Sequence, residues 1–167
     1  YSQSDAGPYY ELLYIPGSLS FGKKRHLSIS KIYVSSWDSV VNGRENWGIP
    51  KEYCDFQVRY GANGVDEVRL VRDGQVIVEL AFKPRLFRLP FDGRLIPARL
   101  RTLAQQFKGR EFVYIPTAKG HVKPASLVHS HIDPRYFPDV SQGKVMACVK
   151  VIDFDMTFPV ATVRYLD

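Results

Sequence analysis

The chain has 167 residues, of which 45% are hydrophobic and 24% are charged. These proportions are ordinary for a globular protein and allow one domain with a substantial buried core. The 23 lysine and arginine residues outnumber the 17 acidic residues, and the formal net charge of +6 favours acidic partners. The cations are interleaved with acidic residues, and no zinc-ligand spacing, helix-turn-helix pattern or RNP-like aromatic motif accompanies them. The sequence therefore argues against nucleic-acid binding.

The cysteines and the apolar runs bear on the compartment. Cys54 and Cys148 allow one disulfide, although buried thiols in a reducing compartment are an equal alternative. No apolar run reaches the length needed to cross a bilayer, and no signal-peptide pattern opens the chain. We therefore expect a cytoplasmic protein. The first residue is Tyr1 rather than Met, which indicates a processed protein or a fragment.

The first part of the chain alternates strand-like runs with turns. The aromatic and aliphatic run of residues 9–15 predicts a strand that ends in a turn. The basic cluster of residues 23–25 predicts the tip of a hairpin. Residues 27–34 alternate with apolar side chains on both sides, which predicts a strand covered on both faces. Residues 35–41 then predict a short helical turn with a serine cap.

One stretch, residues 42–51, combines features that a plain surface loop rarely has. It reads Asn-Gly-Arg-Glu-Asn-Trp-Gly-Ile-Pro-Lys, with adjacent opposite charges beside a large aromatic side chain. Gly43, Gly48 and Pro50 predict a loop with an unusual backbone path, and such loops often hold functional side chains. The alternative is a structured turn in which Trp47 fills one end of the core.

The clearest local signal is a hairpin in the middle of the chain. Residues 65–72 and 75–82 alternate apolar and polar side chains on either side of Asp73-Gly74, which predicts a two-residue type I′ turn. Residues 56–60 predict a half-exposed strand before it. Residues 83–97 hold three prolines and predict a long ordered crossover loop, because proline donates no ladder hydrogen bond.

The last part of the chain predicts one helix and further strands. Apolar side chains within residues 98–107 recur at helical spacing and predict a helix. Residues 112–115, 119–132 and 162–166 predict strands. The mostly apolar residues 144–158 predict a long strand in the middle of a sheet.

Two histidines raise the question of a metal site. His129 and His131 would project from the same face of a strand, but no third ligand stands at a recognisable spacing. The sequence therefore favours surface or core histidines, and we expect no metal and no other cofactor.

Many strands, few helices and no regular alternation of strands with helices predict a mainly β fold of the α+β type. We expect an antiparallel cone-like β-barrel with one or two short helices, formed by residues 1–167 as a single domain. A closed sheet leaves no long aromatic strand at an exposed edge. Its interior is filled by side chains or holds a small ligand.

Two motifs together resemble the acetoacetate decarboxylase superfamily. The first is residues 7–17, Gly-Pro-Tyr-Tyr-Glu-Leu-Leu-Tyr-Ile-Pro-Gly, and the second is residues 43–51, Gly-Arg-Glu-Asn-Trp-Gly-Ile-Pro-Lys. The hairpin and a late turn at residues 137–140 stand in the same order as in that family. The first motif is most similar to decarboxylase-like proteins of unassigned activity. The resemblance implies a barrel with a hydrophobic pocket, usually in an oligomer, and the family's N-terminal segment with its substrate-binding arginine has no counterpart here.

The resemblance also implies a chemistry. In the active enzymes a lysine amine attacks the ketone of a β-keto acid, and the resulting iminium acts as an electron sink. Carbon dioxide then leaves as an enamine forms. The amine must be neutral to attack, so burial or a nearby cation must lower its pKa, and acetoacetate decarboxylase is itself the standard example of such an amine.

The motifs assign candidate residues to these roles. The second motif places a glutamate in the pocket, and Glu45 matches it, with proton handling or substrate positioning as its expected role. The family has two cationic residues at the end of the strand after the hairpin, where this chain has one lysine, Lys83. Lys83 is therefore the only nucleophile that the resemblance nominates. The expected substrate-binding residues are Arg44, Trp47 and Tyr14.

These expectations define a function and its alternatives. We expect a protein that acts on a small keto acid or carbonyl compound in an apolar pocket, by lysine Schiff-base decarboxylation if it is an enzyme. The alternatives are a non-catalytic barrel that binds a lipophilic small molecule, with Lys83 solvated at a strand end, and a basic interaction module. The expected partners are the small-molecule ligand and further copies of the chain in a homo-oligomer, with no nucleic acid and no membrane.

Overall fold

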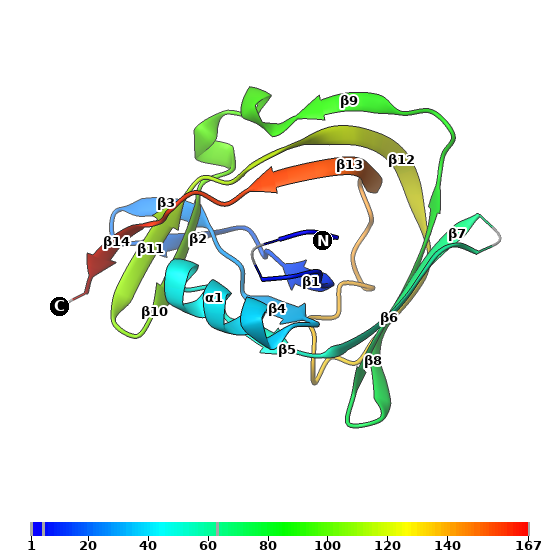
Figure 1. Cartoon of the computed structure of the whole chain (residues 1–167), viewed down its shortest axis with the longest axis horizontal. Coiled ribbons are helices and arrows are strands. Elements are labelled where there is room, and N and C mark those ends of the chain that lie inside the picture. The colour runs from blue at the N-terminus through cyan, green and yellow to red at the C-terminus, as the bar shows by residue number, and fades with distance from the viewer. Residues whose placement is uncertain (1, 5, 63, 167) are drawn as a thin grey trace. The chain divides into compact units, whose positions relative to one another are not determined.

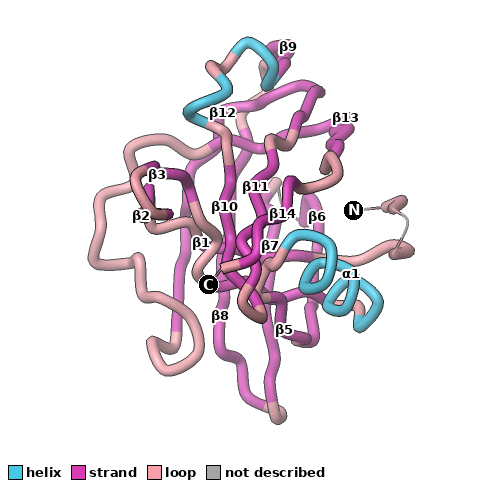
Figure 2. The backbone as a smooth tube through the Cα atoms, turned by 90° about the vertical axis from the view of Figure 1, so that its left-hand side faces the viewer, coloured by secondary structure: helices cyan, strands magenta, loops and turns pink. Residues whose placement is uncertain are grey.

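The computed structural model describes residues 2–4, 6–62 and 64–166, and strands are its main elements (Figure 1, Figure 2). The chain divides into two compact units. Unit 1 is formed by residues 1–53, 92–118 and 156–167, and unit 2 by residues 54–91 and 119–155. The single domain expected from the sequence stays a prediction.

Unit 1 contains two sheets. The three-stranded sheet has the order β1-β4-β5, with β1 Glu11–Tyr14, β4 Lys31–Val34 and β5 Lys51–Tyr53. The five-stranded sheet has the order β14-β11-β10-β3-β2, with β2 Ser18–Phe21, β3 Lys24–Leu27, β10 Leu103–Phe107, β11 Arg110–Tyr114 and β14 Thr162–Tyr165. Neighbouring strands pair antiparallel, except for β4 with β5 and β10 with β3, which are parallel. The hairpin predicted around residues 23–25 is confirmed as β2 and β3.

The one α-helix among the described residues, α1 (Trp37–Trp47), has a recognisable cap at each end. Ser36 Oγ accepts a hydrogen bond from the backbone N–H of Ser39 at 3.3 Å. Gly48 follows in the left-handed conformation with φ of 64°, and its N–H donates to the carbonyl of Arg44 at 3.1 Å. The expected loop over residues 42–51 is therefore wrong for its first part, because the helix continues to Trp47. A single helical glycine costs only about 1 kcal/mol, which the packing of the helix offsets.

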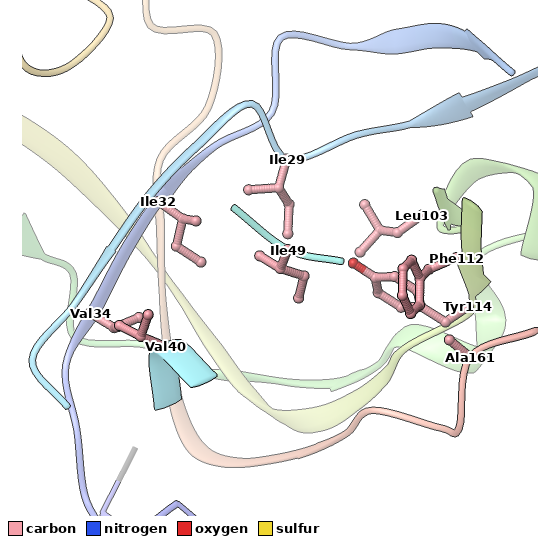
Figure 3. Packing of buried hydrophobic residues seen from close by; sticks show 9 residues of the cluster. All are labelled: Ile29, Ile32, Val34, Val40, Ile49, Leu103, Phe112, Tyr114 and Ala161. Atoms are coloured by element: carbon pink, nitrogen blue, oxygen red, sulfur yellow. The ribbon is translucent and has the colours of Figure 1, made fainter. Parts of the chain in front are cut away.

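The hydrophobic core of unit 1 lies between α1 and strands of both sheets (Figure 3). It is formed by Ile29, Ile32, Val34, Val40, Ile49, Leu103, Phe112, Tyr114 and Ala161. A side chain at Gly48 would put its Cβ 2.6 Å from Cδ2 of Phe112. The left-handed φ and this close contact both require glycine at the end of α1.

The helix predicted over residues 98–107 is wrong. A short 3-10 turn, η2 (Ala98–Leu100), is followed by β10, which pairs with β11 through the turn Lys108-Gly109. The φ angles of these two turn residues are 50° and 68°, as a tight hairpin turn of this kind requires. Strand pairing on both sides of β10 therefore overrides the helical spacing of its apolar residues.

Unit 2 contains a curved sheet with the order β13-β12-β8-β7-β6, in which β9 also pairs with β12 (Figure 1). The strands are β6 Asp55–Ala62, β7 Val65–Arg72, β8 Gln75–Pro84, β9 Leu89–Asp92, β12 Thr117–Ile132 and β13 Val149–Thr157. The hairpin of β7 and β8 is confirmed, and its turn residues Asp73 and Gly74 have the positive φ angles of a type I′ turn, 51° and 75°. The proline-rich segment before residue 97, expected to be a loop, contains β9 and a 3-10 turn, η1 (Gly93–Leu95).

The long apolar run of residues 144–158 does not form the long central strand that was predicted. Only its second part forms a strand, β13, and this strand stands at the end of its sheet rather than in the middle. Val149 is 57% exposed and Phe154 is 44% exposed. Apolar composition alone does not distinguish a central strand from an edge strand. With one α-helix and mainly antiparallel strands among the described residues, the predicted fold class is nevertheless confirmed.

Candidate active site

A lysine and a glutamate meet in the interior of unit 1. Nζ of Lys51 lies 3.0 Å from Oε2 of Glu11, and the two side chains are only 8% and 10% exposed. Lys51 is the only lysine or arginine that is buried in the described part of the chain. Ion pairs of this kind are uncommon in protein interiors, because desolvating both charges costs free energy. We call these residues the Lys51–Glu11 pair.

The register of the three-stranded sheet brings the pair together. Glu11 is the first residue of β1 and stands opposite Val34, whereas Lys51 is the first residue of β5 and stands opposite Ile32. Val34 and Ile32 are two residues apart on the central strand β4, so they share one face of the sheet. Glu11 and Lys51 therefore project from the same face, and their side chains meet across β4.

Helix α1 holds the lysine from the other side. Nζ of Lys51 donates a hydrogen bond to Oγ of Ser39 at 2.9 Å. A Cβ atom at Gly43 would lie 2.5 Å from Cδ of Lys51, so a larger residue at this position would require the lysine side chain to shift. The ammonium group also lies 5.0 Å from the centre of the Tyr9 ring, close enough for a cation–π interaction. Strand register, hydroxyl and glycine together fix the position of Nζ.

The Lys51–Glu11 pair lines a cavity of about 300 Å³ in unit 1. This volume is at the lower end of the range found for small-molecule pockets. The lining side chains mix a few polar groups with aromatic and aliphatic ones. They belong to Gln3, Ser4, Ala6, Tyr9, Glu11, Ile29, Ile32, Ser39, Asn42, Gly43, Trp47, Ile49, Lys51, Met156, Thr157 and Phe158.

Glu45 lies elsewhere. Its side chain is 46% exposed, with Oε1 2.7 Å from Nζ of Lys108 and Oε2 3.1 Å from Nη2 of Arg110. The hydrogen bond from Lys108, followed by that from Arg110, lowers the pKa of the Glu45 carboxyl below its ordinary value. Glu45 is not among the residues that line the cavity, so its expected position inside the pocket is wrong. We call Glu45, Lys108 and Arg110 the surface cluster.

The other predicted site residues are scattered. Lys83 is an exposed residue of β8 in unit 2. Arg44 donates from Nε to the backbone carbonyl of Lys51 at 2.8 Å and so fixes the backbone of the lysine. Tyr14 is the last residue of β1. Of the five predicted residues, only Trp47 lines the cavity in the described part of the chain. The described residues also contain no group of side chains that could hold a metal ion.

The two residues that sequence reasoning missed stand in the two motifs that it used. Glu11 is the only acidic residue of the first motif, and Lys51 is the last residue of the second. The signal was alternation, because Lys51 follows the buried Ile49 by two residues and so faces the same side of an extended segment. A charge on the inward side of a strand marks a candidate functional group.

The fold and the pair define a β-sheet protein with a cavity lined by a buried lysine. The chain belongs to the acetoacetate decarboxylase family, because the model of that family matches residues 1–148. The resemblance drawn from the two motifs is thereby confirmed. No curated protein matches the chain.

Several solved structures are similar to the chain, among them two decarboxylase-type proteins. One is an acetoacetate decarboxylase from Legionella pneumophila, with a TM-score of 0.65 and 14% sequence identity over 95% of this chain and 67% of that chain. The other is an acetoacetate decarboxylase-like enzyme from Sphingomonas wittichii, with a TM-score of 0.62 and 14% identity over 95% of this chain and 69% of that chain. At this identity the likeness shows the fold. None of the described helices has both the length and the apolar character needed to cross a membrane.

Proposed function

We propose that the chain binds a small keto acid or related carbonyl compound in the cavity of unit 1 and forms an imine with it at Lys51. The observation that carries this proposal is the Lys51–Glu11 pair, with 3.0 Å between Nζ and Oε2 at the wall of a cavity of about 300 Å³. Membership of the acetoacetate decarboxylase family supports a lysine as the reacting group.

The two side chains have complementary roles in this reaction. Attack on a carbonyl carbon requires the free amine, and the Glu11 carboxylate is placed to accept the proton that Nζ gives up. The amine adds to the carbonyl carbon to give a carbinolamine, and the proton held by Glu11 then passes to its hydroxyl, which leaves as water and produces an iminium. The hydroxyl of Ser39, 2.9 Å from Nζ, holds the nitrogen in position for this step.

Decarboxylation of a β-keto acid follows from the same iminium. The bond between the α-carbon and the carboxylate breaks, carbon dioxide leaves, and the electron pair moves to the nitrogen to give an enamine. Water supplies the proton that converts the enamine back to an iminium by protonation at carbon, and Glu11, with Oε2 3.0 Å from Nζ, is placed to relay it. Hydrolysis then releases the ketone and restores the Lys51 amine.

Borohydride trapping tests the proposal. The protein is incubated with acetoacetate and borohydride, and the reduced adduct is located by peptide mass spectrometry. We expect the adduct on Lys51, and we expect none in the Lys51→Arg variant. If the wild-type protein yields no adduct on any lysine, the imine mechanism is rejected.

Lys83 provides a matched comparison in the same experiment. It was the nucleophile nominated by resemblance, and that role stays a prediction until trapping locates the adduct. We expect the Lys83→Arg variant to form as much adduct as the wild-type protein. An adduct that disappears in Lys83→Arg and persists in Lys51→Arg would assign the chemistry to Lys83 instead.

The aromatic and aliphatic part of the cavity lining also suits the second candidate, a protein that binds a lipophilic molecule without turnover. Native mass spectrometry of the freshly purified protein distinguishes the two. A bound small molecule, with no carbonyl compound trapped at Lys51, would favour binding over catalysis.

A further inference from the structure

The cavity of unit 1 has an apolar side that the chemistry at Lys51 does not require. Trp47, Phe158 and Met156 line the same cavity as the Lys51–Glu11 pair. The Trp47 and Phe158 rings meet edge to face, with 5.7 Å between their centroids. Together they form an aromatic corner, by which we mean Trp47 and Phe158.

The aromatic corner offers contact surface rather than hydrogen bonds. The one polar atom of the Trp47 side chain, Nε1, already donates to the carbonyl of Pro159 at 2.8 Å. That bond also ties the end of α1 to the segment that carries Phe158. What the corner presents to the cavity is therefore apolar ring surface, which favours an apolar group of a ligand.

The size of the cavity points the same way. A volume of about 300 Å³ equals that of roughly ten water molecules in the liquid, at about 30 Å³ each. Acetoacetate, with seven non-hydrogen atoms, leaves a substantial part of this space empty. A ligand that reaches from Lys51 to the aromatic corner fills more of it and removes more apolar surface from water.

We propose that the carbonyl substrate carries a ring-sized apolar group, aryl or branched alkyl, which packs against Trp47 and Phe158 while its carbonyl carbon lies at Nζ of Lys51. This inference rests on the proposed function and adds the class of substrate. The polar end of the cavity performs the chemistry, and the aromatic corner selects the substrate.

A pair of methyl ketones tests this selection. Butanone and benzylacetone present the same methyl ketone, and benzylacetone has an additional phenyl ring. The concentration that gives half-maximal borohydride trapping at Lys51 is measured for each. We expect a value at least about tenfold lower for benzylacetone, because burying a phenyl ring is favourable by more than one hydrophobic methylene group, which already gives about tenfold discrimination.

Two variants locate the origin of the preference. Trp47→Leu and Phe158→Leu each remove one ring from the corner, and we expect each to bring the two half-maximal concentrations within about threefold of one another. Trp37→Leu is the matched control. Trp37 is the first residue of the same helix, is 63% exposed and stacks on Tyr53, and does not line the cavity. We expect this variant to keep the full preference.

The outcomes separate this proposal from the proposed function. Equal half-maximal concentrations for the two ketones in the wild-type protein would overturn the ring-sized substrate and leave imine formation at Lys51 intact. A preference that both leucine variants keep, with circular dichroism showing them folded, would also overturn it. If neither ketone nor acetoacetate is trapped at all, the proposed function fails as well.

Discussion

Two clusters of charge in unit 1 contain the same kinds of groups and differ in what surrounds them. In the Lys51–Glu11 pair, the two side chains are 8% and 10% exposed and line a cavity. In the surface cluster, Glu45 is 46% exposed and pairs with Lys108, which is 62% exposed, and with Arg110. Glu45 and Lys51 are six positions apart in one motif, so a motif match locates the segment without deciding which charge faces the pocket. The two clusters differ in burial, and charge–charge interactions are stronger between buried groups than between exposed ones.

The largest expected effect follows from removing the buried cation. Lys51→Met keeps much of the side-chain volume and leaves the Glu11 carboxylate buried without its partner. We expect a loss of about 3 kcal/mol in the free energy of unfolding, measured by urea denaturation, together with loss of trapping. The control is Lys108→Met in the surface cluster, which should change stability far less and leave trapping unchanged. Equal destabilisation by the two substitutions would contradict the difference between the clusters.

The second-largest effect is expected for Gly43→Ala. In an exposed helix this change would stabilise the protein by about 1 kcal/mol. Here the new methyl group would overlap the Lys51 side chain, so we expect no net gain in stability. We also expect the rate of trapping to fall at least about tenfold, because small displacements of a reacting group lower reaction rates strongly. Val41→Ala is the control, since Val41 is on the same helix and 61% exposed.

That prediction also separates positioning of the lysine from simple damage to the fold. If the alanine at position 43 lowers trapping only by displacing Nζ, the pH profile of trapping should shift while the urea midpoint stays near that of the wild-type protein. A lower midpoint with an unchanged pH profile would indicate a purely structural role for Gly43.

A smaller effect on stability is expected when both members of the buried pair are replaced. The double variant Glu11→Leu with Lys51→Met exchanges two desolvated charges for apolar side chains. Such exchanges are often neutral or stabilising, so the free energy of unfolding should return to within about 1 kcal/mol of the wild-type value. Trapping should stay absent. A double variant as unstable as Lys51→Met would show that the pair itself stabilises the fold.

The smallest effect belongs to Glu45. Lys108 and Arg110 lower the pKa of its carboxyl, so the stabilisation it provides is present above the ordinary carboxyl pKa and is lost as the pH falls through the lowered value. Glu45→Gln should remove this small acid-dependent part of the stability and leave trapping unchanged. Urea denaturation at neutral and acidic pH, at low and high salt, measures this change in stability. Loss of trapping in Glu45→Gln would return this residue to the active site.

The sequence was a good guide where structure is decided locally. The hairpin of β7 and β8 follows from Asp73-Gly74, because the positive φ angles at both positions suit these residues and fix the strands on either side. The stretch from residue 98 to residue 107 was not predictable in this way. Its apolar spacing suits a helix. Only its pairing with the neighbouring β11 and with β3, which is distant in the sequence, makes it a strand.

The site shows the same limit at the level of single side chains. The two family motifs contain Glu11 and Lys51, but the choice among their charges depended on the continuation of the helix predicted at residues 35–41 as far as Trp47, which the sequence did not indicate. Within α1, Glu45 stands four residues after the exposed Val41 and so lies on the solvent face, whereas Gly43 and Trp47, also four residues apart, line the cavity. Once the helix is known, its periodicity explains the position of each.

The aromatic corner also joins two distant parts of the sequence. Met156, Thr157 and Phe158 line the same cavity as the Lys51–Glu11 pair, although more than a hundred residues separate them in the sequence. Trp47 stands near Lys51 in the sequence, and its indole N–H donates to the carbonyl of Pro159, which ties the end of α1 to the distant segment that carries Phe158. A substitution at Phe158 should therefore alter the apolar side of the cavity and leave the Lys51–Glu11 pair in place.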